Sequence, residues 1–91
     1  MKKVLIIEDD HRLSESISTV ISKEGLKSEA AFDGQMALKF FSNNEFDLIV
    51  LDVNLPKLNG MDLCRKFREV NPTIPILIIT AFSEIDNTLQ E

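Results

Sequence analysis

Short apolar runs alternate along the chain with segments in which apolar residues recur every three or four positions. The runs are typical of strands covered on both faces, and the spaced segments are typical of helices with one face on a core. The runs predict strands at residues 4–7, 26–32, 46–51 and 75–80, and the spaced segments predict helices at 11–24, 36–43, 63–70 and from 82 onwards. The predicted order is therefore βαβαβαβα.

This order predicts a doubly wound α/β fold. Parallel strands need crossover helices, and right-handed crossovers place helices on both faces of one sheet. The second strand, 26–32, is the most polar of the four, which suits an edge position. In such folds the functional site lies at the carboxyl ends of the strands.

Composition narrows the class of protein. Ninety-one residues with 44% hydrophobic and 27% charged positions are typical of one globular domain, and we expect that domain to span residues 1–91. The net charge of −5 argues against a nucleic-acid partner, and no apolar run is long enough to cross a membrane. A single cysteine, Cys64, indicates the reducing cytoplasm. With three glycines and no P-loop, nucleotide binding is not expected.

Acidic and hydroxyl side chains gather where the predicted strands end. Glu8, Asp9 and Asp10 follow the first strand, Asp52 follows the third, and Thr80 ends the fourth. If these strands are neighbours, the carboxylates lie close together and repel unless a cation is present. Mg²⁺ suits a site with few carboxylates and open water positions. An aspartate beside that ion can attack phosphorus, and the Thr80 hydroxyl can bind a phosphoryl oxygen.

Each of these residues also has a simpler interpretation. Asp10 suits the N-cap of the following helix, and Thr80 suits a strand as a β-branched residue. The loop residues Pro56 and Gly60 fit turn chemistry, and Cys64 has the helical spacing of a core position. The signal for a site therefore comes from the combination of residues at the ends of three strands.

Four segments, distributed in register along the whole chain, carry a family resemblance. They are Ile6-Ile7-Glu8-Asp9-Asp10, Asp33-Gly34 with Ala37-Leu38, Asp47 to Asp52 followed by Leu55-Pro56 and Gly60, and Pro75 to Ala81. In this order they resemble the receiver domain of two-component response regulators. The resemblance implies the flavodoxin-like (CheY-like) fold with strand order 2-1-3-4-5, and a signalling phosphoacceptor instead of an enzyme.

The resemblance also implies a role for each site residue. Asp52 matches the phosphoacceptor, which takes a phosphoryl group from a histidine kinase. Asp9 matches the carboxylate that coordinates Mg²⁺ directly, Glu8 the one that acts through water, and Asn54 the backbone carbonyl ligand. Thr80 matches the switch hydroxyl that moves toward the phosphoryl group.

The chain also departs from the family pattern. The family's lysine, the switch aromatic residue, the fifth strand and the fifth helix have no counterpart before residue 91. We therefore expect an incomplete receiver domain, from the first strand to the start of the fourth helix, with slow or poorly retained phosphorylation.

Two alternatives remain open at this point. One is a fragment that does not signal and forms a homodimer or another self-associated state, either through its exposed fourth strand or by exchanging segment 82–91. The other is an aspartate-nucleophile phosphatase of the haloacid-dehalogenase type. Its Asp-x-Asp pattern is not matched here, because Asp52 is followed by Val53-Asn54.

Overall fold

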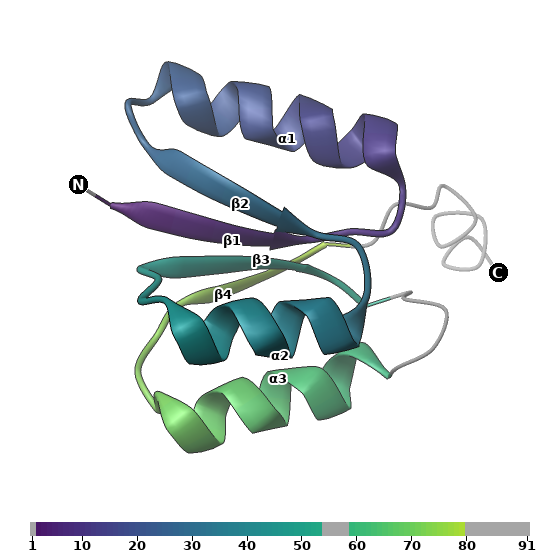
Figure 1. Ribbon diagram of the computed structural model, residues 1–91, viewed down its shortest axis with the longest axis vertical. Helices are drawn as coiled ribbons and strands as arrows, with labels where there is room; N and C mark the ends of the chain where they lie inside the picture. Colours follow the sequence, from purple (N-terminus) through teal and green to yellow (C-terminus); the bar gives the residue numbers. More distant parts are fainter. Residues whose placement is uncertain (1, 54–58, 80–91) are drawn as a thin grey trace, which may run out of the picture.

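The computed structural model describes residues 2–53 and 59–79, which form four strands and three helices (Figure 1). In chain order they are β1 (Lys3–Ile7), α1 (His11–Lys23), β2 (Lys27–Ala31), α2 (Gly34–Asn43), β3 (Leu48–Asp52), α3 (Gly60–Val70) and β4 (Ile76–Ile79). The predicted order is confirmed for these seven elements. The helix predicted from residue 82 lies outside the described residues.

The four strands form one parallel sheet in the order β2-β1-β3-β4. Helix α1 covers one face of this sheet, and α2 and α3 lie on the other (Figure 1). The doubly wound α/β architecture is confirmed, and the polar strand β2 lies at the edge, as its composition predicts.

Alternation along the strands divides the core into two clusters. Leu5 and Ile7 of β1 face α2 and α3, where they pack with Phe67, whereas Val4 and Ile6 face α1. All of these side chains are fully buried. The continuous apolar run of β1 is therefore explained by helices on both faces of the sheet.

Side chains at the helix starts set the boundaries that the sequence predicts. The Asp10 carboxylate accepts hydrogen bonds from the N–H groups of Arg12 (2.9 Å) and Leu13 (3.2 Å), which confirms Asp10 as the N-cap of α1. Asp33 caps α2 in the same way. Helix α1 ends at Lys23, and Gly25, two residues later, turns the chain with a φ of 80° that glycine adopts readily.

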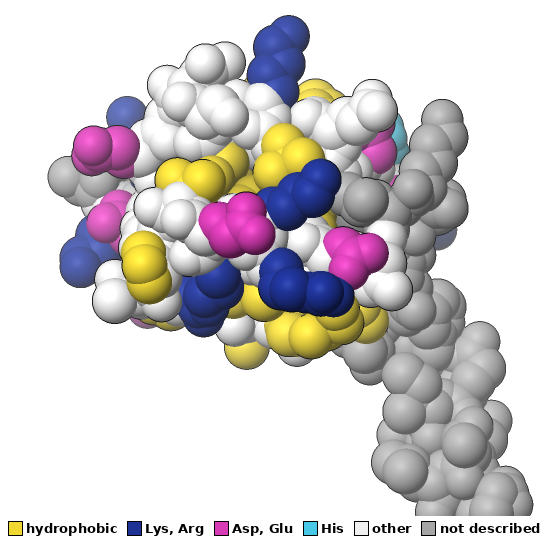
Figure 2. Space-filling view, turned by 90° about the horizontal axis from the view of Figure 1, so that it is seen from below, with side chains coloured by type: hydrophobic (Ala, Val, Ile, Leu, Met, Phe, Trp, Pro, Cys, Tyr) yellow, Lys and Arg dark blue, Asp and Glu magenta, His cyan; other side chains and the backbone are white. Residues whose placement is uncertain are grey.

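The face on the side of α2 and α3 mixes charges of both signs with hydrophobic side chains (Figure 2). One exposed ion pair on α3 joins Arg65 to Asp62 at 2.6 Å. Within the described part of the chain, no helix has the length and apolar character needed to cross a membrane.

Among the described residues, the α1 face of the sheet is less completely covered than the face on which α2 and α3 lie. The apolar run of β4 predicts a strand covered on both faces, but Leu77 is 54% and Ile78 42% exposed. Among the described residues no strand pairs with the outer edge of β4, which agrees with the other expectation, that of an exposed fourth strand. Val20 of α1 is also exposed, at 62%. An apolar groove of about 580 Å³ runs between α1 and strands β3 and β4. Its lining residues are Leu13, Ser16, Ile17, Val20, Ile21, Leu48, Val50, Leu77 and Ile79.

Candidate functional site

The strand register brings the acidic residues of two strands to one place. Ile7 lies opposite Leu51 in the β1–β3 pair, so the next residues along, Glu8 and Asp52, are neighbours at the carboxyl edge. Asp52 is the last residue of β3, and Glu8 follows β1 directly. The convergence that the sequence predicts at this edge therefore occurs for the first and third strands.

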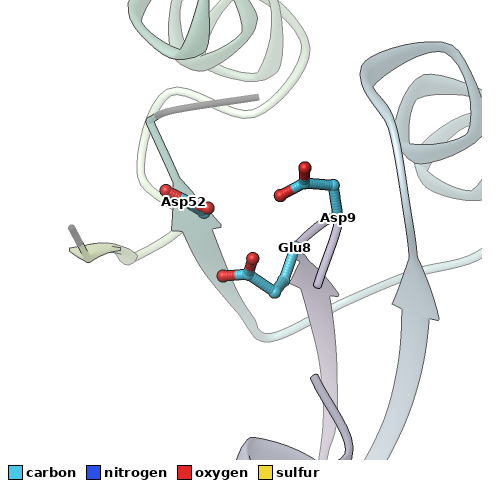
Figure 3. Close-up of side chains that lie close together, drawn as sticks. All are labelled: Glu8, Asp9 and Asp52. Carbon is cyan, nitrogen blue, oxygen red and sulfur yellow. The ribbon is translucent and has the colours of Figure 1, made fainter. Parts of the chain in front are cut away.

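Glu8, Asp9 and Asp52 form a compact carboxylate cluster (Figure 3). One carboxylate oxygen from each residue can be chosen so that all three lie within 4.8 Å of one another. Glu8 and Asp52 are 1% and 3% exposed, whereas Asp9 is exposed to solvent. The cluster thus has a buried floor of two carboxylates and one open side.

Asp10, the third acidic residue of the run, contacts the cluster through its backbone N–H and not through its carboxylate. Its side chain caps α1, while its N–H donates a hydrogen bond to Oε2 of Glu8 at 3.0 Å. The other oxygen, Oε1 of Glu8, is buried and has no hydrogen-bond partner among the described groups. The Asp10 N–H therefore holds one oxygen of the Glu8 carboxylate, and the other oxygen can still bind a ligand.

Electrostatics at the cluster oppose full ionisation. The pKa of Glu8 is raised from its ordinary value of 4.5 to about 7, and burial is the largest of several causes. Within this net shift, the hydrogen bond from the Asp10 N–H lowers the pKa, and the neighbouring carboxylates of Asp52 and Asp9 raise it. A proton or a cation must offset this repulsion at neutral pH.

The donor set fits a hard divalent cation. Three carboxylates supply the oxygen ligands that Mg²⁺ prefers, and the open side at Asp9 leaves room for water or a phosphoryl oxygen. The unpartnered Oε1 of Glu8 supports the same conclusion, because a buried polar atom without a partner costs free energy that a bound cation or its water can recover.

Two predicted site residues cannot be placed. Asn54, expected to give a backbone carbonyl to the metal, and Thr80, expected to bind the phosphoryl group, lie outside the described residues. Each directly follows a described segment that ends at this edge, since Val53 adjoins Asn54 and Ile79 adjoins Thr80. Ile79 is paired with Asp52 in the sheet register.

The structure also shows two features that sequence reasoning missed. His11, which is exposed, stacks on Phe32 with ring centroids 3.9 Å apart. Gly60, interpreted as turn chemistry, begins α3 directly against the backbone of Val53. No local pattern predicts either contact, because each joins residues that only the folded chain brings together.

Comparison with known proteins agrees with this architecture. The response regulator receiver domain family matches residues 4–91. An uncharacterized transcriptional regulatory protein of Bacillus subtilis, YcbL, is 43% identical over 77 residues, which cover 85% of this chain and 34% of YcbL.

Solved structures show the same fold. Response regulator TrrA of Thermotoga maritima, in complex with Mg²⁺-BeF, aligns with a TM-score of 0.86 at 28% identity. That alignment covers 98% of this chain and 77% of the TrrA chain. A crystal structure of histidine kinase ThkA in complex with TrrA aligns with a TM-score of 0.84 at 29% identity, covering 91% of this chain and 72% of the matched chain.

The matches cover most of this chain but a much smaller share of each curated relative. This chain spans about a third of the length of the curated relatives that it matches first. It is nevertheless matched along almost its whole length by the receiver family, in which the domain is a signalling phosphoacceptor and not a classical enzyme. The match over residues 4–91 and the shared fold establish that the chain belongs to the response regulator receiver domain family of two-component signal transduction.

Proposed function

We propose that Asp52 of this chain accepts a phosphoryl group in a site where Glu8, Asp9 and Asp52 bind Mg²⁺. The observation that carries the proposal is the carboxylate cluster, in which one oxygen from each of these residues lies within 4.8 Å of the others. It joins a metal site and a nucleophile in one place, as phosphoryl transfer to a carboxylate requires.

The proposed reaction transfers one phosphoryl group. A carboxylate oxygen of Asp52 attacks the phosphorus of a phosphohistidine, a P–O bond forms, and the P–N bond breaks. The histidine nitrogen leaves with the bonding pair and takes up a proton from water. The position of Asp52 at the end of β3 holds this oxygen at the open carboxyl edge, while the sheet fixes its backbone.

The roles of the remaining site residues belong to the same proposal. When bound, Mg²⁺ neutralises negative charge on the phosphoryl oxygens. We assign direct coordination to Asp9 and contact through water to Glu8, whose unpartnered Oε1 suits a water ligand. The backbone carbonyl of Asn54 and the hydroxyl of Thr80 complete the proposed set as metal ligand and phosphoryl-binding switch.

The proposed phosphodonor is a histidine kinase. The complex of histidine kinase ThkA with TrrA supports this assignment, because this chain shares the fold captured in that complex. We place the exchange in the cytoplasm, in keeping with a single cysteine that has no partner for an internal disulfide. The proposed unit is a receiver domain that takes in residues 1–91 of this chain.

Mass measurement after incubation with acetyl phosphate and Mg²⁺ tests the proposal. The expected product carries one phosphoryl group, and Asp52→Asn abolishes the gain in mass. Asp62→Asn is the matched control, since it removes the same charge from an exposed carboxylate on α3 and should label like the parent. Labelling that persists in Asp52→Asn would refute Asp52 as the acceptor.

The open α1 face supports a second proposal, that this 91-residue chain self-associates. Leu77 is 54% exposed on an edge strand beside the apolar groove, and exposed apolar edges tend to pair with another chain. We propose a two-fold homodimer formed through β4, independent of phosphorylation. Light scattering at micromolar concentration should show a dimer, and a compact monomer would contradict the proposal.

A further inference from the structure

Two glycines of this chain are required for opposite reasons. Gly25 has a φ of 80°, and a Cβ added there would meet no atom within 4 Å. Gly60 has no positive φ, but a Cβ added there would lie 2.6 Å from Cα of Val53 and 3.1 Å from its carbonyl oxygen. Gly25 is therefore needed for its backbone conformation, and Gly60 only for the space that it leaves.

The crowded atoms at Gly60 cannot move aside independently. Cα and the carbonyl oxygen of Val53 are backbone atoms, and the N–H of Val53 donates to the carbonyl of Ile79 at 3.4 Å. Val53 is also bonded directly to Asp52. Any shift that makes room for a methyl group on this side therefore displaces the end of β3.

Helix α3 is held equally firmly on its own side. Asn59 caps it through a hydrogen bond from the N–H of Met61 at 2.8 Å, and Leu63 and Phe67 anchor it in the core with no exposed surface. A helix fixed by fully buried side chains resists translation, because protein interiors are closely packed. The approach of α3 to Val53 is thus set from both sides.

We infer that Gly60 is a positioning residue for the phosphoacceptor. By allowing α3 to begin against Val53, it sets where β3 ends and holds the Asp52 carboxylate within reach of Glu8 and Asp9. The inference rests on the proposed function, since it assigns Gly60 a role in that same site. Metal–ligand distances tolerate shifts of only about 0.2 Å, so a displaced strand end weakens cation binding.

The test compares Gly60→Ala with Gly25→Ala. Calorimetry with Mg²⁺ and denaturant unfolding are measured on both variants and the parent. Both substitutions should lower stability, the first by crowding and the second by backbone strain. Only Gly60→Ala should weaken Mg²⁺ binding, by about tenfold or more, and slow labelling by acetyl phosphate. A folded Gly60→Ala protein with the parent's Mg²⁺ affinity would overturn the inference.

A second variant covers the case in which Gly60→Ala does not fold. The double variant Gly60→Ala with Val53→Gly removes the Val53 Cβ, which lies 3.1 Å from the added methyl group, and frees the backbone to yield. It should bind Mg²⁺ more weakly than Val53→Gly alone. Equal affinities of these two proteins would overturn the inference.

Amide hydrogen exchange separates this inference from the proposed function. In metal-free protein, Gly60→Ala should reduce protection of the Val53 N–H, whereas Gly25→Ala should not. If the parent fails to bind Mg²⁺, the proposed function is wrong, and Val53 exchange still decides whether Gly60 holds the strand end. Unchanged protection in Gly60→Ala would contradict that role.

Discussion

Leu5 in β1 and Glu8 directly after that strand are almost equally buried, with 0% and 1% exposure, yet their burial has opposite consequences. Burying a leucine side chain stabilises the fold by about 1.5–3 kcal/mol. Burying the Glu8 carboxyl raises its pKa to about 7, which means that its ionised form destabilises the fold. The sheet interior is thus built for stability, and its carboxyl edge retains a cost that a bound cation can offset.

The largest effect is expected in the interior. Phe67→Ala removes a fully buried ring between α3 and the sheet and should lower the free energy of unfolding by about 3–5 kcal/mol, measured in urea. Val70→Ala on the same helix is the control, since Val70 is exposed and its loss should cost about 0.5 kcal/mol or less. Similar losses in both variants would contradict the assignment of the core.

The pH dependence of the stability of the metal-free protein tests the cost of burying Glu8 at the carboxyl edge of the sheet. Because the pKa of Glu8 is about 7 folded and near 4.5 unfolded, its stabilising contribution is full below pH 4.5 and lost as pH rises through 7. Stability should fall by about 3 kcal/mol between these limits. Glu8→Gln should remove that fall. If the stability of the parent protein does not fall over this pH range, the pKa of Glu8 is not raised by folding.

Ionisation of Glu8 should raise the affinity for Mg²⁺, whereas it lowers the stability of the metal-free protein. Ionisation of Glu8 prepares the site for a cation, so Mg²⁺ affinity should rise as pH passes through 7. Calorimetric titrations on either side of this pH measure the change. In Glu8→Gln the rise should be absent, because glutamine does not titrate.

A smaller effect is expected at the open side of the cluster. Asp9→Asn removes the charge of one proposed cation ligand and should weaken Mg²⁺ binding by about tenfold, equivalent to about 1.4 kcal/mol, in calorimetry. Asp10→Asn is the matched control, because asparagine caps a helix as well as aspartate does and Asp10 lies outside the cluster. Equal losses in the two variants would indicate a diffuse charge effect instead of a coordinated ion.

The smallest change in folding stability is expected at the exposed edge of the sheet. Leu77→Lys should alter unfolding of the monomer by only about 0.5 kcal/mol, because Leu77 is already 54% exposed. In light scattering it should nevertheless abolish the proposed dimer by placing a charge on each side of the contact. Met61→Lys, at a similarly exposed site on α3, should leave association unchanged.

Local patterns predicted most of the fold and part of the site. The apolar runs and helical spacings predicted the seven described elements in their order, and Asp10 was rightly interpreted as a possible cap. The burial of β4 was overestimated, because an apolar run has the same composition at an edge as in the middle of a sheet. The roles assigned to the site residues, which are Glu8, Asp9, Asp52, Asn54 and Thr80, stay predictions.

The sequence by itself determined the alternation of strands and helices, since periodicity and capping act over a few residues. It also placed acidic residues after the first and third strands. Only the tertiary structure decided that these strands are neighbours, with Ile7 opposite Leu51 and so Glu8 beside Asp52. The raised pKa of Glu8 and the contact of Gly60 with Val53 have the same origin. Desolvation and steric contact depend on residues far apart in the chain, and these meet only when the sheet and helices pack.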